Sequence, residues 1–97
     1  MKPFRWDPEK NELLKTDRGI SFEEIVLAIE EDGLKDILVH PNQDRYPGQV
    51  VLVVSFQDYV FLVPSVEEEA YYFLKTIIPS RKATRDYLDR GDSDEET

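Results

Sequence analysis

Apolar and polar residues follow two different periods along this chain. Over residues 8–33 the apolar residues recur at helical spacing, whereas over residues 34–78 they form shorter runs rich in Val, Ile, Phe and Tyr, which are typical of strands. The pattern predicts, in order, one strand, two helices, four strands and a final helix. Because hairpin-linked strands pair antiparallel, we expect an α+β fold with a small antiparallel sheet of about four strands, and with two N-terminal helices and one C-terminal helix mostly on one face.

The first half of the chain carries clear helix boundaries. A short strand is predicted at residues 4–6, and Asp7 then reads as an N-cap with Pro8 at the first helical position. We expect this helix to run to about residue 17, with Gly19 as its left-handed C-cap. Ser21 and Glu24 form a capping box, which predicts a second helix over residues 22–32 that ends at Gly33.

Four strands are predicted in the second half, at residues 34–40, 49–56, 59–63 and 70–78. A loop rich in turn residues covers 41–48, and Gln57 and Asp58 make a tight hairpin turn. Strict alternation in the last strand would place Tyr72, Leu74, Thr76 and Ile78 on one face. Pro79 then ends the strand, and Ser80 can cap a last helix over residues 81–90.

The composition is that of one folded domain with a heavily charged surface. The chain has 97 residues, of which 40% are hydrophobic and 34% charged, and its formal net charge is −9. We expect a single domain over residues 1–90, followed by a disordered acidic tail over 91–97. Cysteine is absent from the sequence, and no spacing of His, Asp and Glu resembles a metal site, so we expect neither a metal nor a cofactor.

Membrane insertion and secretion are not indicated by the pattern. The longest apolar run covers residues 50–54, far below the roughly 20 residues that a membrane span needs. The first residues are charged and lack the apolar run of a secretory signal. We therefore expect a cytoplasmic protein without a membrane partner.

One stretch is basic in an otherwise acidic chain. Residues 70–90 hold five basic and two acidic residues, a net charge of +3. With Ser80 as N-cap, Arg81, Lys82 and Arg85 lie in the first turns of the last helix, where free N–H donors and the helix dipole also favour a phosphate. The alternative is that these cations pair with the surplus carboxylates, such as those of residues 67–69.

Other side chains offer chemistry as well. His40, the single histidine, ends a predicted strand and has the pKa range of a general acid or base, although it can equally anchor the following loop. Tyr46 and Tyr87 are candidates for stacking on RNA bases, although tyrosines in so small a domain are mostly core. Lys75 is a further cation near the basic helix.

Three blocks of the sequence resemble the BrnT-type toxins of bacterial type II toxin–antitoxin systems. They are Phe-Arg-Trp-Asp-Pro-Glu-Lys-Asn at 4–11, Gly-Ile-Ser-Phe-Glu-Glu at 19–24 and Ile-Ile-Pro-Ser-Arg-Lys-Ala-Thr-Arg at 77–85. The blocks occur in the family's order and span nearly the whole chain. The chain departs from the family pattern at Arg18, where members have His, at Thr76, where they have Arg, and at Asp86-Tyr87, where they often have Glu.

The resemblance implies a RelE-like fold, metal-free RNA cleavage and neutralisation by a ribbon-helix-helix antitoxin. In such ribonucleases basic side chains bind the scissile phosphate and a general base activates the 2′-hydroxyl. The alternative is a non-catalytic module that binds an antitoxin or another basic protein. The candidate catalytic residues are Arg81, Lys82, Arg85, His40 and Tyr87. The candidate RNA-binding residues are Lys75, Arg81, Lys82, Arg85 and Tyr46.

Overall fold

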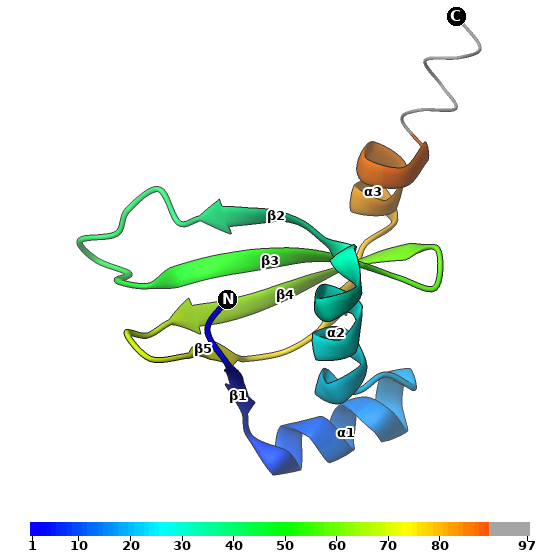
Figure 1. Ribbon diagram of the computed structural model, residues 1–97, viewed down its shortest axis with the longest axis horizontal. Helices are drawn as coiled ribbons and strands as arrows, with labels where there is room; N and C mark the ends of the chain where they lie inside the picture. The colour runs from blue at the N-terminus through cyan, green and yellow to red at the C-terminus, as the bar shows by residue number, and fades with distance from the viewer. Residues whose placement is uncertain (90–97) are drawn as a thin grey trace, which may run out of the picture.

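The computed structural model describes residues 1–89 and has the predicted α+β class (Figure 1). The predicted acidic tail at 91–97 lies outside the described residues. The elements are β1 (Phe4–Trp6), α1 (Pro8–Arg18), α2 (Phe22–Ala28), the wide helical turn η1 (Ile29–Gly33), β2 (Leu34–Val39), β3 (Gln49–Phe56), β4 (Tyr59–Glu67), β5 (Tyr72–Leu74), β6 (Ile78–Pro79), α3 (Arg81–Thr84) and a second wide turn η2 (Arg85–Asp89).

The sheet is mixed, so the prediction of an antiparallel sheet of about four strands was wrong. Its strand order is β1-β5-β4-β3-β2, and β6 also pairs with β4. Strand β1 runs parallel to β5, with Phe4 opposite Tyr72 and Trp6 opposite Leu74. The Tyr72 N–H also donates to the Pro3 carbonyl (2.9 Å). This pairing joins segments far apart in the sequence, and the local pattern of neither segment contains it.

The predicted last strand at residues 70–78 is two strands. Strand β5 ends at Leu74 and β6 begins at Ile78, and between them the ladder is interrupted. Alternation would place Ile77 on the face opposite Leu74, but both side chains are buried in the same core cluster. The interruption therefore lets the chain turn Ile77 inward without a matching strand register.

Strand β4 is longer than predicted and passes through a proline. It continues from Tyr59 to Glu67, beyond the predicted end at Val63. Pro64 has no N–H to donate, but its carbonyl accepts a hydrogen bond from the Lys75 N–H (2.9 Å). The proline thus remains inside the sheet because only its acceptor is needed there.

The predicted caps of the N-terminal helices are confirmed. Asp7 accepts from the Glu9 N–H (3.0 Å), and Gly19 ends α1 at φ 68°. Ser21 and Glu24 exchange both bonds of the capping box. Regular helix ends at Ala28, however, because η1 follows.

Gly33 ends the second helical segment as predicted. It does not take the left-handed conformation of a usual glycine cap. Asp32 takes the left-handed conformation at φ 68°. A Cβ added at Gly33 would lie 2.6 Å from the carbonyl oxygens of Ala28 and Ser55. The glycine is therefore required by the close approach of two backbones.

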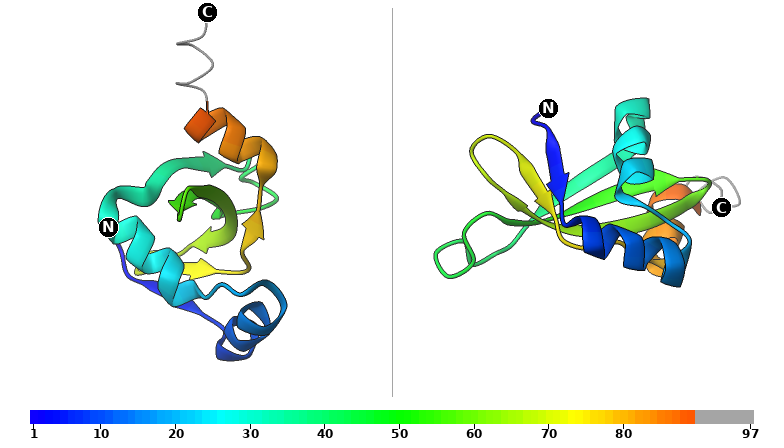
Figure 2. Two further views of the ribbon diagram at one scale, coloured as in Figure 1. Left: turned by 90° about the vertical axis from the view of Figure 1, so that its right-hand side faces the viewer. Right: turned by 90° about the horizontal axis from the view of Figure 1, so that it is seen from below.

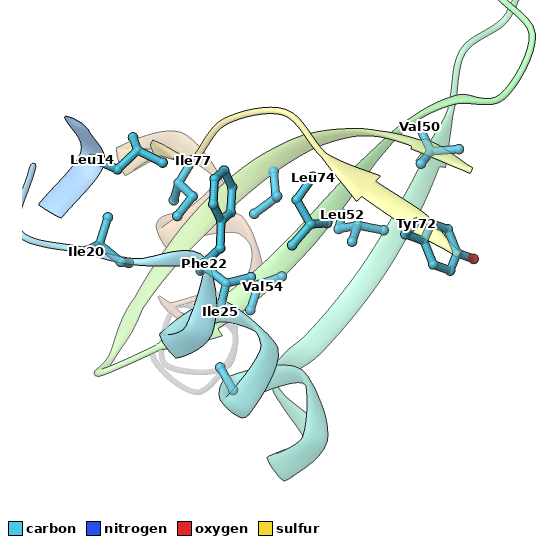
Figure 3. Packing of buried hydrophobic residues seen from close by; sticks show 12 residues of the cluster. Leu14, Ile20, Phe22, Ile25, Val50, Leu52, Val54, Tyr72, Leu74 and Ile77 are labelled. Atoms are coloured by element: carbon cyan, nitrogen blue, oxygen red, sulfur yellow. The ribbon is translucent and has the colours of Figure 1, made fainter. Parts of the chain in front are cut away.

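Helices cover both faces of the sheet, which corrects the prediction that they lie mostly on one. We call the face that packs on α2 the α2 face; its core contains Phe22, Ile25, Leu52 and Val54 (Figure 3). We call the other face the α3 face, where Val53, Val60 and Ala83 form a smaller cluster with Leu62 and Leu88. Figure 2 shows α2 and the N-terminal segment on the same side of the curved strands. Strand β3 has apolar side chains on both faces, so each face needs its own cover.

Candidate functional site

The basic segment is anchored to the beginning of β4 by a small set of hydrogen bonds. Ser80 caps α3 by accepting from the Ala83 N–H (3.0 Å), and its own N–H donates to the Val60 carbonyl (3.0 Å). The Thr84 hydroxyl donates to the Ser80 carbonyl (2.7 Å) and accepts from the Val60 N–H (2.8 Å). Ala83 is buried between these contacts. The predicted cap is confirmed, and the helix start is held in one orientation against the sheet.

Three cations project from this anchored segment into solvent. Arg81, Lys82 and Arg85 are all exposed. The Lys82 ammonium lies 3.8 Å from Asp86, and the Arg85 guanidinium lies 3.9 Å from the same carboxylate. Exposed ion pairs at such distances are worth little. Among residues 1–89 the structure records no ion pair for Arg81, so the cluster keeps a positive surplus.

The structure contains no ion pair between these three cations and the carboxylates at 67–69. Glu67 pairs instead with Lys2, at 3.0 Å. Asp86 is the carboxylate beside the cluster, and it lies on η2, next to the cations themselves. A bound phosphate would therefore compete with one carboxylate, that of Asp86, for Lys82 and Arg85.

Tyr87 links the segment that carries the cations to a carboxylate of strand β2. Its hydroxyl donates to Asp36 Oδ2 (3.0 Å), while Asp36 Oδ1 accepts from the Ile37 N–H (2.8 Å). The contact joins η2 to the edge strand β2, across 51 positions of sequence. Sequence reasoning missed Asp36, because an acidic residue on an exposed strand position carries no motif and the contact is long-range.

His40, Tyr46 and Lys75 form a second group at the other end of the strands. The His40 ring packs against Tyr46 with ring centroids 4.4 Å apart and ring planes tilted by 37°, and its Nδ1 accepts from the Asn42 N–H (3.0 Å). Lys75 Nζ donates to Gln49 Oε1 (3.3 Å). These contacts are those of a loop-anchoring histidine, the second of the two interpretations of His40.

The two groups share the α3 face but not one site. Asp36 pairs with Val53 on β3, whereas His40 donates its backbone N–H to Gln49. The separation is four residues along β3, about 13 Å of extended chain. Because side chains alternate along a strand, Asp36, Leu38 and His40 lie in one row.

A shallow apolar groove separates the two groups. It has a volume of about 260 Å³, and Leu38, Val51 and Pro64 are among the residues that line it. Leu38 is 45% exposed. The α3 face thus offers cations at one end, an aromatic pair at the other and an uncovered apolar strip between them.

Residues 1–89 contain neither a candidate membrane-spanning helix nor a cluster of metal-ligating side chains. In this part of the chain no helix is long and apolar enough to cross a membrane. Within the same range no group of three or more His, Cys, Asp and Glu side chains lies close enough together to hold a metal ion.

Comparisons with protein-family models, with curated proteins and with solved structures found no match. The resemblance to BrnT-type toxins therefore stays a prediction that rests on three sequence blocks.

Proposed function

We propose that this chain is a toxin-like ribonuclease that holds an RNA phosphate at Arg81, Lys82 and Arg85. One observation carries the proposal: three exposed cations stand on an anchored helix start and share a single, loosely paired carboxylate. The chain has a net charge of −9, yet these three cations lie together and repel one another, so the cluster does not stabilise the fold. Binding of an anion would explain why they are placed side by side.

The proposed reaction is metal-free cleavage next to the bound phosphate. Asp36 takes the proton of the 2′-hydroxyl, the 2′-oxygen bonds to phosphorus, and the bond from phosphorus to the 5′-oxygen breaks. Tyr87 donates its proton to the leaving 5′-oxygen. The guanidinium and ammonium groups stabilise the extra negative charge on the phosphoryl oxygens. The products are a 2′,3′-cyclic phosphate and a 5′-hydroxyl.

Tyr46 and Lys75 extend the RNA track in this proposal. Tyr46 is 41% exposed and can stack on a base, because aromatic rings accept any base face. Lys75 is exposed and contacts an amide rather than a carboxylate, so its charge is open to a second phosphate. His40 supports Tyr46 and takes no part in the chemistry.

The proposal includes a RelE-like fold and a ribbon-helix-helix antitoxin as partner, both from the family resemblance. The α+β architecture, with the last helical segment packed on one face of a curved sheet, supports the fold assignment. The acidic character of the chain also favours a basic partner.

The second candidate is a non-catalytic toxin-like module that pairs with an antitoxin or another basic protein. It is favoured by the position of His40, whose imidazole is engaged in its own loop and whose backbone lies four residues along the strand from Asp36, about 13 Å of extended chain. The ribonuclease candidate, in contrast, depends entirely on Asp36 and Tyr87 for its acid–base chemistry. Of the two candidates, only the ribonuclease predicts RNA cleavage.

The binding test compares two double variants of equal charge. Arg81→Ala with Lys82→Ala should weaken binding of single-stranded RNA about ten-fold or more, and should lower the slope of log affinity against log salt by about 1.4, or 0.7 per lost contact. Lys10→Ala with Lys15→Ala removes the same charge from α1 and should change affinity less than about two-fold. Equal effects from the two pairs would show that binding follows net charge alone and that the α3 site is wrong.

The cleavage test uses Asp36→Asn and Tyr87→Phe. Each should leave RNA affinity near that of the wild-type chain and reduce the rate of cyclic phosphate formation roughly 10²- to 10⁴-fold. Circular dichroism and thermal unfolding establish that the variants fold. A folded wild-type chain that leaves RNA intact, and does not slow growth when it is expressed without a partner, excludes the ribonuclease and leaves the binding module.

A further inference from the structure

A second groove opens on the α2 face, away from the cations. It has a volume of about 890 Å³ and runs between the N-terminal strand and the helical segment. Its apolar lining includes Phe4, Trp6, Val26, Ile29 and Leu34. All five are partly buried against the main core and remain partly exposed in the groove. The RNA proposal makes no use of this surface.

The walls of the groove are held in place by the rest of the fold. Phe4 stacks on Tyr72 with ring centroids 5.7 Å apart, and Trp6 stacks on Phe22 at 5.6 Å. Strand β1 is paired with β5 along its length. The opposite wall belongs to α2 and η1, which pack on β3. A partner would therefore meet a preformed surface, which lowers the entropic cost of binding.

The rim of the groove is acidic. Glu30 and Asp32 lie among the lining residues, and both are exposed, as is Glu31 between them. Lys2 is the basic side chain of the lining that the structure describes, and its Nζ lies 3.0 Å from Glu67 Oε2 and donates to the Glu68 carbonyl (2.6 Å). Among residues 1–89 the structure records no ion pair for Glu30 or Asp32.

The apolar lining and the acidic rim together indicate which kind of molecule the groove can bind. Carboxylates on the rim repel nucleic acid and anionic lipid, so the groove differs from the α3 face in the charge it accepts. Exposed aromatic and aliphatic side chains in a groove of this size favour an apolar stripe. An amphipathic helix presents such a stripe at positions i, i+3, i+4 and i+7, with polar residues on both sides.

We propose that the α2-face groove binds an amphipathic helix of a protein partner whose apolar stripe is flanked by lysine or arginine residues. The apolar stripe covers Trp6, Val26 and Ile29, while the flanking cations reach the carboxylates of Glu30 and Asp32. The groove and the cations of α3 lie on opposite faces of the sheet, so a helix in the groove leaves the RNA site open. The proposal stands whether or not the chain binds RNA.

Tryptophan fluorescence reports on this groove directly, because Trp6 is the single tryptophan of the sequence. The probe is a synthetic helical peptide with leucines at i, i+3, i+4 and i+7 and lysines beside them. A matched peptide carries glutamate in place of each lysine. Titration of the full chain with the lysine peptide should give a saturable change in Trp6 emission, and the glutamate peptide should bind at least about ten-fold more weakly.

Matched variants separate the groove from the overall negative charge. Glu30→Gln with Asp32→Asn should raise the Kd of the lysine peptide about three- to ten-fold. Asp17→Asn with Asp44→Asn removes the same charge from exposed positions outside the lining and should raise it less than about two-fold. Ile29→Ala should weaken binding by several-fold, whereas Leu27→Ala, at an exposed position outside the lining, should not.

Any of three results in the peptide titrations would overturn the proposal. They are equal binding of the two peptides, equal effects of the two charge-removing pairs, and a lack of saturable Trp6 response in chain shown to be folded. Backbone amide shifts provide a second measurement, since they should cluster at Phe4, Trp6 and Val26; shifts confined to Leu38 and Val39 would place the peptide on the edge strand instead and refute the groove. RNA affinity measured on the same variants should not change, so failure here is distinguishable from failure of the RNA site.

Discussion

The two faces of the sheet are formed by the same strands but differ in how much apolar surface they bury and in the charge they carry. The α2 face buries a large cluster that includes Phe22, Ile25 and Leu52, and it carries an acidic groove. The α3 face buries a small cluster around Val53 and Val60 and carries the cations. Apolar burial dominates on one face, and on the other the helix is held by hydrogen bonds of Ser80 and Thr84 with the Val60 backbone.

The difference teaches where function can be placed in a small domain. Stability depends on buried apolar area, which is concentrated on the α2 face. A segment held mainly by a few hydrogen bonds tolerates exposed like charges nearby, because little of the core depends on it. The four predictions that follow test this division of roles, from the largest expected effect to the smallest.

Truncation of the main core should cost far more than truncation of the small cluster. Phe22 is fully buried and stacks on Trp6, so Phe22→Ala should lower the free energy of unfolding by about 3–5 kcal/mol. Leu88 is only partly buried on the α3 face, and Leu88→Ala should cost less than about 2 kcal/mol. Urea unfolding measures both values. Similar costs would remove the proposed contrast between the faces.

Asn11 is a buried polar link between the two N-terminal helices. Its Oδ1 accepts from the Phe22 N–H (2.8 Å), and its Nδ2 donates to Glu23 Oε1 (2.7 Å). Asn11→Ala should lower the free energy of unfolding by about 1–3 kcal/mol, because the Phe22 N–H is left buried without a partner. An exposed control, Thr16→Ala, should change it by less than about 0.5 kcal/mol. A cost for Asn11→Ala as small as that of the control would contradict this role.

The Ser80 cap should matter less for global stability. Ser80→Ala removes the acceptor of the Ala83 N–H and should lower the free energy of unfolding by about 1 kcal/mol. Because the cap orients Arg81 and Lys82, the variant should also weaken RNA binding. An unchanged affinity would mean that the cations work without a fixed orientation.

Glu23 supplies the smallest effect, which depends on pH. The hydrogen bond from the Asn11 amide, and a second from its own backbone N–H, lower the pKa of the Glu23 carboxyl. A folded-state pKa below the unfolded value of about 4.3 contributes stability that is present above that pH and is lost as the pH falls through the folded-state value.

Carboxyl-carbon NMR titration of wild type and Asn11→Ala measures this shift. The pKa of Glu23 should return toward its ordinary value in the variant, and the acid-dependent loss of stability should shrink. If the variant keeps the lowered pKa, Asn11 is not the main cause.

The candidate site was only partly predictable. The basic run, the Ser80 cap and the stacking candidate Tyr46 can be read from residue types and short spacings. Asp36 and the acidic groove could not be found in that way. Both depend on contacts between segments far apart in the chain, such as the bond from Tyr87 to Asp36 and the approach of the N-terminal strand to the helical segment.

Sequence alone determined the features that act within a few residues. The Ser21–Glu24 capping box, the Asp7 cap and the hairpin turn at Gln57 and Asp58 all formed as predicted, with the two turn residues at φ 52° and 61°. The α+β class followed from the two hydrophobic periods. These are local preferences of backbone and side chain, so the neighbouring sequence contains them.

Tertiary structure alone decided which segments meet. The parallel pairing of β1 with β5, the interruption before Ile77, the placement of α3 opposite α2 and the division into a basic face and an acidic groove all arise from non-local contacts. A hydrophobic pattern predicts that a residue is buried, but it does not predict which residues pack against it, because burial against any apolar side chain is favourable. Partner choice is settled by the packing of the whole chain.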